Sequence, residues 1–419
     1  MKHKSLIIGL TGRFGAGCTT TSMILKDCKG FNYFSLSESL KKKAKMTING
    51  FDKKEEKEKR KILQDLGDEL RKNGESLAIP VIEEIKQKGL NKVVIDSIRN
   101  PAEVNAFKNK FNNFFLLAID AETETRWQRL NKYIYKGNKD KFCIDDERDA
   151  GENQPDYGQQ VKKCIELADM LVNNNDDFYN KPKGETEKII DEYAQKISDY
   201  VDLIFYHGIR PPSTNELCMH YACSIALKST CLRRQVGAVI VHEKHYNFNK
   251  SKHITDIESY VIATGCNNVP IGETHCRETE EGCYKDHAKL EYLENYNYCR
   301  QCGSKLDKNL ICEKCDFDNS KLPGKLLDIC RAVHAEEAAI LQAAKLGSTS
   351  LEGTKIYTST FPCMLCCKTI INSGIKGVVY LESYPMSESL ALEMFRKCNI
   401  KVSKYEGVNS IAFNRLFKK

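Results

Sequence analysis

One histidine and two cysteines stand at the spacings of metal ligands, and a glutamate lies beside the histidine. Glu336 follows His334 by two residues, and Pro362 precedes a Cys363-x-x-Cys366 pair. One imidazole and two thiolates leave the fourth position of a tetrahedral zinc ion open for water, whereas a structural site normally fills that position with protein. We therefore predict a catalytic zinc bound by His334, Cys363 and Cys366, with Glu336 moving protons between water and substrate.

The His-x-Glu and Pro-Cys-x-x-Cys pieces together are the signature of zinc-dependent nucleobase deaminases. Two further motifs accompany them, Val-Gly-Ala-Val-Ile-Val at 236–241 and Ala-Thr-Gly-Cys-Asn-Asn-Val-Pro at 263–270. With the zinc pieces, these motifs resemble phage and bacterial deoxycytidylate deaminases over residues 213–405. The resemblance implies hydrolysis of deoxycytidine nucleotides, dCMP or dCTP, to deoxyuridine nucleotides and ammonia.

The same resemblance implies which residues contact the substrate. Asn267 matches the family asparagine that holds the deoxyribose, and Tyr384 is similar to a family tyrosine near the substrate. Cys266 and Asn268 stand where the family usually has tyrosine and glycine. A surface aromatic without a role in binding is the open alternative for Tyr384.

Four cysteines around these motifs resemble a second, structural zinc site found in bacterial members of the family. A closed four-thiolate site would hold the loops around the catalytic zinc in place. Unpaired core cysteines are the weaker alternative. The positions are Cys231, Cys276, Cys283 and Cys330, with His275 and His287 as alternative ligands.

A third metal site is predicted from two Cys-x-x-Cys knuckles within an insertion at residues 296–318. Its four cysteines are Cys299, Cys302, Cys312 and Cys315. This spacing is typical of a zinc ribbon, whose short loops fold only around the metal. The proteins of the resemblance lack this insertion. We expect the insertion to stabilise an oligomer, to gate the active site or to contact a partner.

A glycine-rich turn near the start of the chain resembles a phosphate-binding loop. Residues 9–20 have the glycines and threonine of Gly-x-x-x-x-Gly-Lys-Ser/Thr, with Cys18 in the lysine position. Backbone N–H groups of such a loop hold phosphates, but kinases depend on the lysine. We predict a nucleotide sensor, with Mg²⁺ and ATP or another nucleotide, in preference to an active kinase. The predicted nucleotide-binding residues are Gly12, Gly15, Gly17, Cys18, Thr19, Thr20, Arg99, Arg126 and Arg129.

The elements that must position these residues alternate between strands and helices, which predicts an α/β fold. For a first domain at residues 1–206 we expect a P-loop kinase-like parallel sheet with helices on both faces. Residues 143–161, with Arg148, resemble the lid of nucleotide and dephospho-coenzyme A kinases. The strands expected here are 5–10, 92–96 and 114–120, and a long helix is expected at 184–206.

The second domain, at residues 207–419, is expected to be an α/β/α cytidine-deaminase-like layer structure with the zinc ribbon inserted. Both zinc pieces should open helices, because helix N-termini stabilise thiolates. Helices are expected at 215–228, 334–346, 363–373 and 387–398, and strands at 236–242, 260–267, 355–359, 377–381 and 401–405.

The bulk composition limits the partners. The 419 residues carry 64 basic and 57 acidic side chains, a net charge of +7 that suits nucleotides without demanding a nucleic-acid polymer. No apolar run approaches a membrane span, and the chain shows no secretory signal, so we expect a reducing cytoplasm. Of the 19 cysteines, those at short spacings are expected to bind metal there, and others such as Cys28 and Cys164 to be plain core thiols. Two alternatives are a base deaminase acting on RNA or single-stranded DNA and a non-enzymatic zinc-ribbon scaffold. The single tryptophan disfavours the first, and the intact Glu336 disfavours the second.

A P-loop domain joined to such a deaminase resembles bacterial antiphage deoxycytidylate deaminases over the whole chain. That resemblance implies a defence in which loss of deoxycytidine nucleotides starves phage DNA synthesis. The expected partners are deoxycytidine nucleotides, a nucleotide at the P-loop, further copies of the chain in a homo-oligomer, and an RNA or protein regulator.

Overall fold

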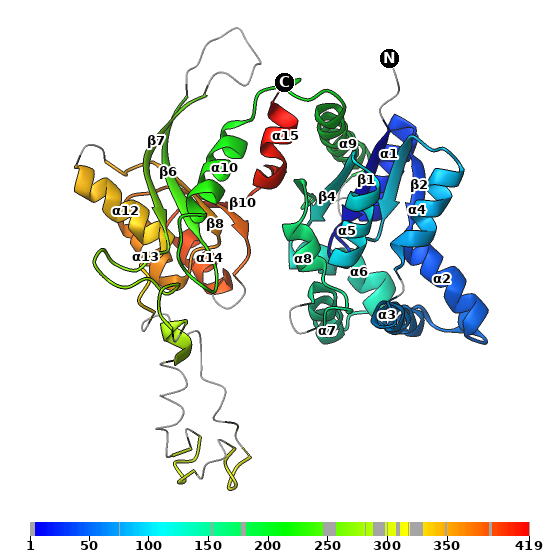
Figure 1. Cartoon of the computed structure of the whole chain (residues 1–419), viewed down its shortest axis with the longest axis horizontal. Coiled ribbons are helices and arrows are strands. Elements are labelled where there is room, and N and C mark those ends of the chain that lie inside the picture. Colours follow the sequence, from blue (N-terminus) through cyan, green and yellow to red (C-terminus); the bar gives the residue numbers. More distant parts are fainter. Residues whose placement is uncertain are drawn as a thin grey trace. The chain divides into compact units, whose positions relative to one another are not determined.

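Two compact units make up the chain (Figure 1). Unit 1 contains Met1–Pro212 together with Glu406–Lys419, and unit 2 contains Ser213–Tyr405. Each unit is built around its own sheet, as the alternating pattern of strands and helices predicts. The computed structural model describes residues 5–74, 76–151, 154–176, 182–245, 257–280, 282–287, 298–299, 301–306, 311–316, 318, 330–347, 350–384 and 388–418.

A six-stranded sheet in the order β11-β5-β4-β1-β3-β2 forms the centre of unit 1. Its strands are β1 (Leu6–Thr11), β2 (Asn32–Ser35), β3 (Lys92–Asp96), β4 (Phe114–Asp120), β5 (Met170–Asn173) and β11 (Gly407–Val408). β1 is buried along its whole length, as is typical of a central strand covered on both faces. All pairs are parallel except that of β11 with β5, so the predicted parallel sheet is mixed at one edge.

Helices cover both faces of this sheet, as predicted (Figure 1). On one face, α1 (Cys18–Lys29) and α9 (Lys183–Phe205) share a buried apolar cluster with β1 and β4. On the other face, Phe107 stacks on Phe114 of β4 with ring centroids 5.6 Å apart. The other helices before α9 are α2 (Leu36–Thr47), α3 (Glu56–Lys72), α4 (Ala78–Gln87), α5 (Pro101–Lys110), α6 (Thr123–Leu130), α7 (Lys139–Ala150) and α8 (Val161–Glu166), with a π-helical turn at Asn131–Tyr135.

The last residues of the chain return to unit 1, which differs from the predicted domains 1–206 and 207–419. β11 pairs antiparallel with β5, and Asn409 donates from its backbone N–H to Asp169 O and from its side chain to Ala168 O. After a 3₁₀ turn (Ser410–Ala412), α15 (Phe413–Phe417) buries Leu416 in the same apolar cluster as α9. Unit 2 is therefore an insertion between two parts of unit 1.

Unit 2 has a five-stranded sheet in the order β10-β9-β8-β6-β7. Its elements are α10 (Thr214–Ala226), β6 (Gly237–His245), β7 (Ile257–Cys266), α12 (Ala335–Leu346), β8 (Lys355–Thr360), α13 (Met364–Asn372), β9 (Gly377–Glu382), α14 (Glu388–Lys397) and β10 (Lys401–Lys404). Ile356 of β8 packs in a cluster with α12, α13 and α14, while the next residue, Tyr357, donates its hydroxyl to Asn215 of α10. Because neighbouring residues of a strand point to opposite faces, the helices form the predicted α/β/α layers.

One glycine allows α12 to lie directly on the sheet. A Cβ atom on Gly265 of β7 would stand 2.2 Å from Ala335 O and 2.4 Å from Ala339 N. Any other residue here would push α12 outward. The close approach brings the first turn of α12 to the end of β7, which Asn267 follows directly.

The inserted segment contains two short β-bridges, Tyr298 with Lys305 and Ile311 with Asp318. Cys299, Cys312 and Leu306 form a small buried cluster between them. Of the predicted ribbon at 296–318, residues 296–297, 300, 307–310 and 317 lie outside the described residues.

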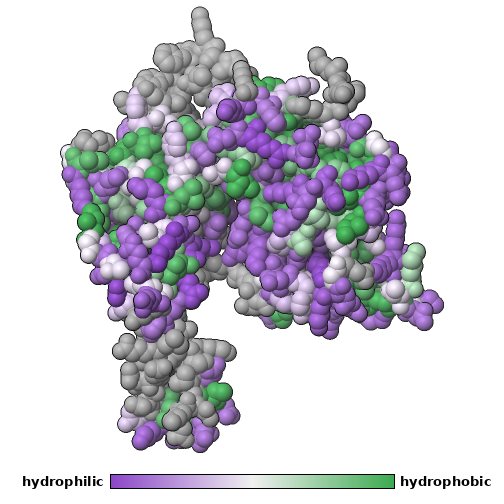
Figure 2. All heavy atoms as spheres, viewed as in Figure 1, coloured by the Kyte–Doolittle hydropathy of each residue, from purple (hydrophilic) through white to green (hydrophobic). Residues whose placement is uncertain are grey.

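The helices that the structure describes fall short of a membrane span in length or hydrophobicity. None of them is both long and apolar enough to cross a membrane. On the face that Figure 2 shows, hydrophobic side chains lie in small groups among hydrophilic ones over each unit. Scattered apolar groups of this kind are ordinary for a folded protein surface.

Candidate active site

The N-termini of two helices carry the predicted catalytic ligands. His334 is the N-cap residue of α12 and Cys363 the N-cap residue of α13, both with extended backbone, and Cys366 lies in the first turn of α13. The free N–H groups and the positive dipole end of a helix favour thiolate over thiol. The prediction that both pieces open helices is confirmed.

The three ligand atoms lie close enough to share one metal ion. His334 Nδ1 is 3.3 Å from Cys363 Sγ and 3.3 Å from Cys366 Sγ, and all three atoms lie within 4.8 Å of one another. A tetrahedral zinc ion, with Zn–S of about 2.3 Å and Zn–N of about 2.0 Å, separates its ligand atoms by roughly 3.5 Å. One imidazole and two sulfurs at these distances fit zinc.

The pKa values of the two thiols shift in opposite directions. The hydrogen bond with Cys366 lowers the pKa of Cys363 to about 4. The same hydrogen bond, followed by burial, raises the pKa of Cys366. A bound cation favours the thiolate form of both cysteines.

Glu336 points its carboxyl group into the interior beside these sulfurs. The side chain is only 4% exposed, and its Oε1 lies 3.4 Å from the hydroxyl of the fully buried Thr358. Burial raises the pKa of Glu336, and the charge of Cys363 raises it further. A carboxyl group of raised pKa next to a metal site can both accept and return a proton near neutral pH.

The two predicted substrate contacts lie around this centre. Asn267 accepts from the Val236 N–H at 2.7 Å and donates to Arg234 O at 2.8 Å, so its amide holds the chain before β6 against the end of β7. Tyr384 is half-buried, and burial together with the charge of Cys363 raises its pKa, which places it near the sulfurs. The substrate role of both residues stays a prediction.

Arg234 is a residue that the sequence did not single out. Its guanidinium is about one third exposed, pairs with Glu382 at 3.0 Å, and lies near enough to Tyr384 to lower the pKa of that phenol. The pair Arg233-Arg234 directly before a strand was the available signal. A cation here is suited to the phosphate of a nucleotide.

The structural zinc predictions have different outcomes. The sulfur atoms of Cys299, Cys302, Cys312 and Cys315 lie within 4.8 Å of one another, as a ribbon site requires. Cys231, Cys276, Cys283 and Cys330 are neighbours, because the other three thiols all raise the pKa of Cys276 after burial does. Among the described residues, the sulfur atoms of these four cysteines do not form a set that lies within 4.8 Å of one another. His275 contacts the Thr230 hydroxyl at 3.1 Å. This second site stays a prediction.

The glycine-rich turn forms a loop between β1 and α1. Gly15 and Gly17 have φ of 83° and 108°, and a Cβ on Gly12 would meet Ile119 O at 2.4 Å. Thr19 donates to Asp96 of β3 at 2.9 Å, a pair placed as a magnesium site would need. Burial raises the pKa of Cys18, so the group in the lysine position is a neutral thiol.

The predicted nucleotide-binding arginines are engaged with the protein itself. Arg129 donates to the carbonyls of Gly15 and Asn174, and Arg126 is fully buried against Ala121 O and Asp146. Arg99 pairs with Asp149. Thr20 is exposed on α1. These contacts shape the loop, and nucleotide binding by the set stays a prediction.

Known proteins resemble the unit that carries the candidate active site. The family described as "Cytidine and deoxycytidylate deaminase zinc-binding region" matches residues 212–382. Deoxycytidylate deaminase of Schizosaccharomyces pombe is 28% identical over 317 residues, 74% of this chain and 76% of that protein. Deoxycytidylate deaminase of Enterobacteria phage T4 is 30% identical over 187 residues, 44% of this chain and 86% of that protein. A cyanophage S-TIM5 dCMP deaminase crystallised with dCMP and dUMP aligns with 47% of this chain and 99% of its own, at 23% identity and a TM-score of 0.28.

Metal content tests both cysteine sets that the structure brings together. We expect at least two zinc equivalents per chain, with Cys312→Ser and Cys363→Ser each removing one, because each loses a ligand. Cys398→Ser, an exposed cysteine, is the control and should change nothing. Elemental analysis of protein purified without chelator measures this. A total of one equivalent, or full zinc content in Cys312→Ser, would contradict the ribbon site, and loss of a third equivalent in Cys276→Ser would establish the four-cysteine site.

Proposed function

The chain belongs to the cytidine and deoxycytidylate deaminase family, and from this we propose that unit 2 hydrolyses the 4-amino group of deoxycytidine nucleotides. The observation that carries the proposal is the buried carboxyl of Glu336 beside the ligand set of His334, Cys363 and Cys366. The family's zinc-binding region spans all four residues.

The reaction exchanges the amino group at C4 for oxygen from water and releases ammonia. A zinc ion, when bound, supplies Lewis-acid activation of water. Glu336 takes a proton from the water and passes it to the ring N3. It then takes the second proton from the new hydroxyl at C4 and delivers it to the leaving amine, so that a carbonyl and ammonia result. Burial raises the pKa of Glu336, which makes its carboxylate a better proton acceptor.

Three side chains around the centre support a nucleotide substrate. We propose that Asn267 contacts the deoxyribose, that Tyr384 covers the base or sugar, and that Arg234 meets the phosphate. The Arg234 guanidinium lies 3.0 Å from the Glu382 carboxylate, which holds it in position. About one third of the Arg234 side chain stays exposed. The related proteins named above act on the monophosphate by their names. We propose dCMP or dCTP as the substrate here, followed by depletion of these nucleotides in phage-infected cells.

Replacing Glu336 by glutamine tests the mechanism. Glu336→Gln keeps the size of the buried side chain but cannot accept a proton, so we expect deamination to fall at least about 100-fold while zinc stays bound. Glu337→Gln, at the exposed neighbouring position of α12, is the matched control and should keep the wild-type rate. Release of ammonia and zinc content are measured on the same samples.

Turnover near the wild-type rate in zinc-loaded Glu336→Gln would refute the mechanism. The same pair of variants tests the defence proposal, which rests on the resemblance to antiphage deaminases. Phage plating on bacteria that express each variant should fall with Glu337→Gln and recover with Glu336→Gln. Equal protection by both would separate defence from deamination.

We further propose that unit 1 binds a nucleotide at residues 12–19 and regulates unit 2 without efficient phosphoryl transfer. The support is a loop with the backbone of a phosphate cradle and a neutral thiol in place of lysine. The covalent insertion of unit 2 between two parts of unit 1 gives regulation a physical route.

Gly17→Ala should disturb this regulation. Its Cβ would stand 2.3 Å from Asn174 Nδ2 at a positive φ, so the loop must change shape. We expect the deaminase kcat or KM, or its response to ATP, to change about fivefold or more. Gly184→Ala, with open space around its Cβ, is the control. Unchanged deaminase kinetics in folded Gly17→Ala, or multiple-turnover kinase activity in the wild type, would overturn the sensor proposal.

A further inference from the structure

The phosphate-binding loop of unit 1 already holds an anion supplied by the chain itself. The backbone N–H of Phe14 donates to Asp149 Oδ2 at 3.0 Å, and Arg99 pairs with Asp149 Oδ1. Asp149 lies on α7 and its side chain is fully buried. A loop N–H of the kind that binds phosphate oxygens therefore donates to a carboxylate oxygen.

A second carboxylate stands one turn earlier on the same face of α7. Asp146 pairs with Arg13 of the loop at 2.5 Å and with Arg126 at 2.9 Å. Arg126 also donates to Phe14 O at 3.3 Å, so Asp146 reaches the loop from two directions. Residues three apart lie on one side of a helix, which lets α7 present both carboxylates to the loop together.

The two carboxylates do not satisfy the donors around the loop. Arg13 Nε and Arg60 Nη2 are buried without a hydrogen-bond partner among the described residues. The Arg60 guanidinium lies 3.7 Å over the Phe14 ring. Buried donors without partners are rare and costly, so they indicate a missing anion with more oxygen atoms than a carboxylate.

The charges lead to the same conclusion. Five guanidinium groups surround the loop, those of Arg13, Arg60, Arg99, Arg126 and Arg129. The acidic groups facing it are fewer, namely Asp96, Asp146 and Asp149. A nucleotide polyphosphate carries more negative charge and more acceptor atoms than the two aspartates of α7. Because the cations around the loop outnumber the acidic groups, it can take the place of these aspartates.

We propose that Asp149, with Asp146, is an internal ligand of the P-loop, and that a nucleotide polyphosphate binds by displacing α7 from the loop. The proposal rests on the proposed nucleotide binding by unit 1 and adds a competitor to it. Arg99 serves both states, because it pairs with Asp149 in this one and lies beside Cys18, where a phosphate would need a cation in place of the missing lysine.

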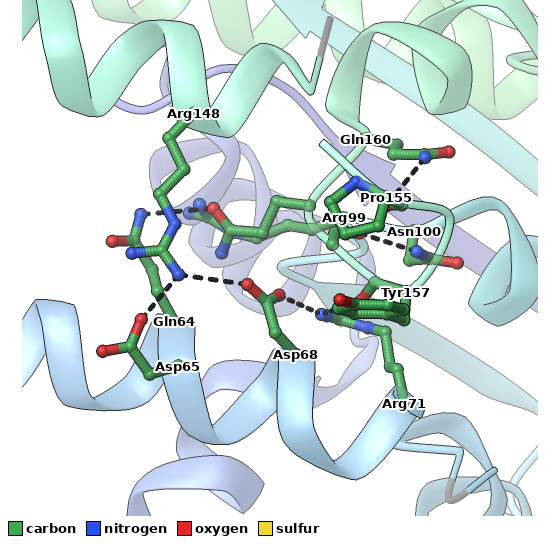
Figure 3. Close-up of polar contacts among 12 residues, drawn as sticks. Gln64, Asp65, Asp68, Arg71, Arg99, Asn100, Arg148, Pro155, Tyr157 and Gln160 are labelled. Carbon is green, nitrogen blue, oxygen red and sulfur yellow. Dashed lines mark hydrogen bonds and ion pairs between the residues drawn. The ribbon is translucent and has the colours of Figure 1, made fainter. Parts of the chain in front are cut away.

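Displacement of α7 also changes its contact with α3. Arg148, the neighbour of Asp149, reaches Asp65 at 2.6 Å and Asp68 at 3.0 Å on α3 (Figure 3). Arg71 of α3 in turn holds Asp68 at 3.3 Å and Glu103 of α5 at 2.9 Å. Occupancy of the loop is thereby linked to ion pairs outside it, which gives a bound nucleotide a structural effect beyond its own site.

Binding of inorganic pyrophosphate with Mg²⁺ to the full-length chain tests the proposal by calorimetry. Asp149→Asn keeps an oxygen for the Phe14 N–H but removes the charge, so we expect affinity to rise about tenfold or more as the competing state weakens. Glu147→Gln, an exposed position of the same helix, is the control and should bind like the wild type. Equal or weaker binding by Asp149→Asn than by the control would overturn the internal ligand, and absence of binding in all three would overturn nucleotide binding as well.

Hydrogen exchange on the wild-type chain gives a test that needs no variant. Pyrophosphate should slow amide exchange in residues 12–19 and speed it in α7, because the helix loses its contacts with the loop. Slower exchange in both segments would contradict displacement. Ammonia release from dCMP, followed on the same samples, reports whether unit 2 is intact and keeps this outcome separate from that of the deaminase proposal.

Discussion

Unit 2 depends on one constraint: three predicted metal ligands and one buried carboxyl meet at the N-termini of two helices. His334 and Cys363 cap α12 and α13, so the sheet must hold both helix ends at one edge. Gly265 allows this because α12 lies directly on β7 there. Glu336 is fixed by the same arrangement, since it belongs to the first turn of α12, two residues after His334, and is buried. A shift of either helix would separate the Glu336 carboxyl from the predicted metal ligands.

Local patterns in the sequence predicted much of this arrangement. The alternation of apolar residues in strands and the residues that begin and end helices predicted every strand and helix that positions the active site. The ligand spacing predicted the set of His334, Cys363 and Cys366 that the structure brings together. β11 was missed because two residues have no periodicity, and its pairing with β5 follows only from the folded chain. The exact distances among Cys231, Cys276, Cys283 and Cys330 depend on loops, which residue spacing does not determine.

Buried carboxylates do different work in the two units. Burial raises the pKa of Glu336, which suits proton transfer. Asp149 and Asp146 instead form ion pairs with Arg99, Arg13 and Arg126 beside the loop that is proposed to bind phosphate. Sequence reasoning identified the loop but not these carboxylates, because α7 is more than a hundred residues distant along the chain and no motif connects the two.

The central claim is that this chain removes the amino group of a deoxycytidine nucleotide. The most direct measurement incubates the zinc-loaded protein with each cytosine and adenine deoxy- and ribonucleotide separately and identifies the products by mass. For dCMP or dCTP we predict a gain of about one mass unit, because the net reaction replaces NH by O. We predict no conversion of adenine nucleotides. Conversion of ribonucleotides or adenine nucleotides alone, or of no nucleotide at all, would contradict the account.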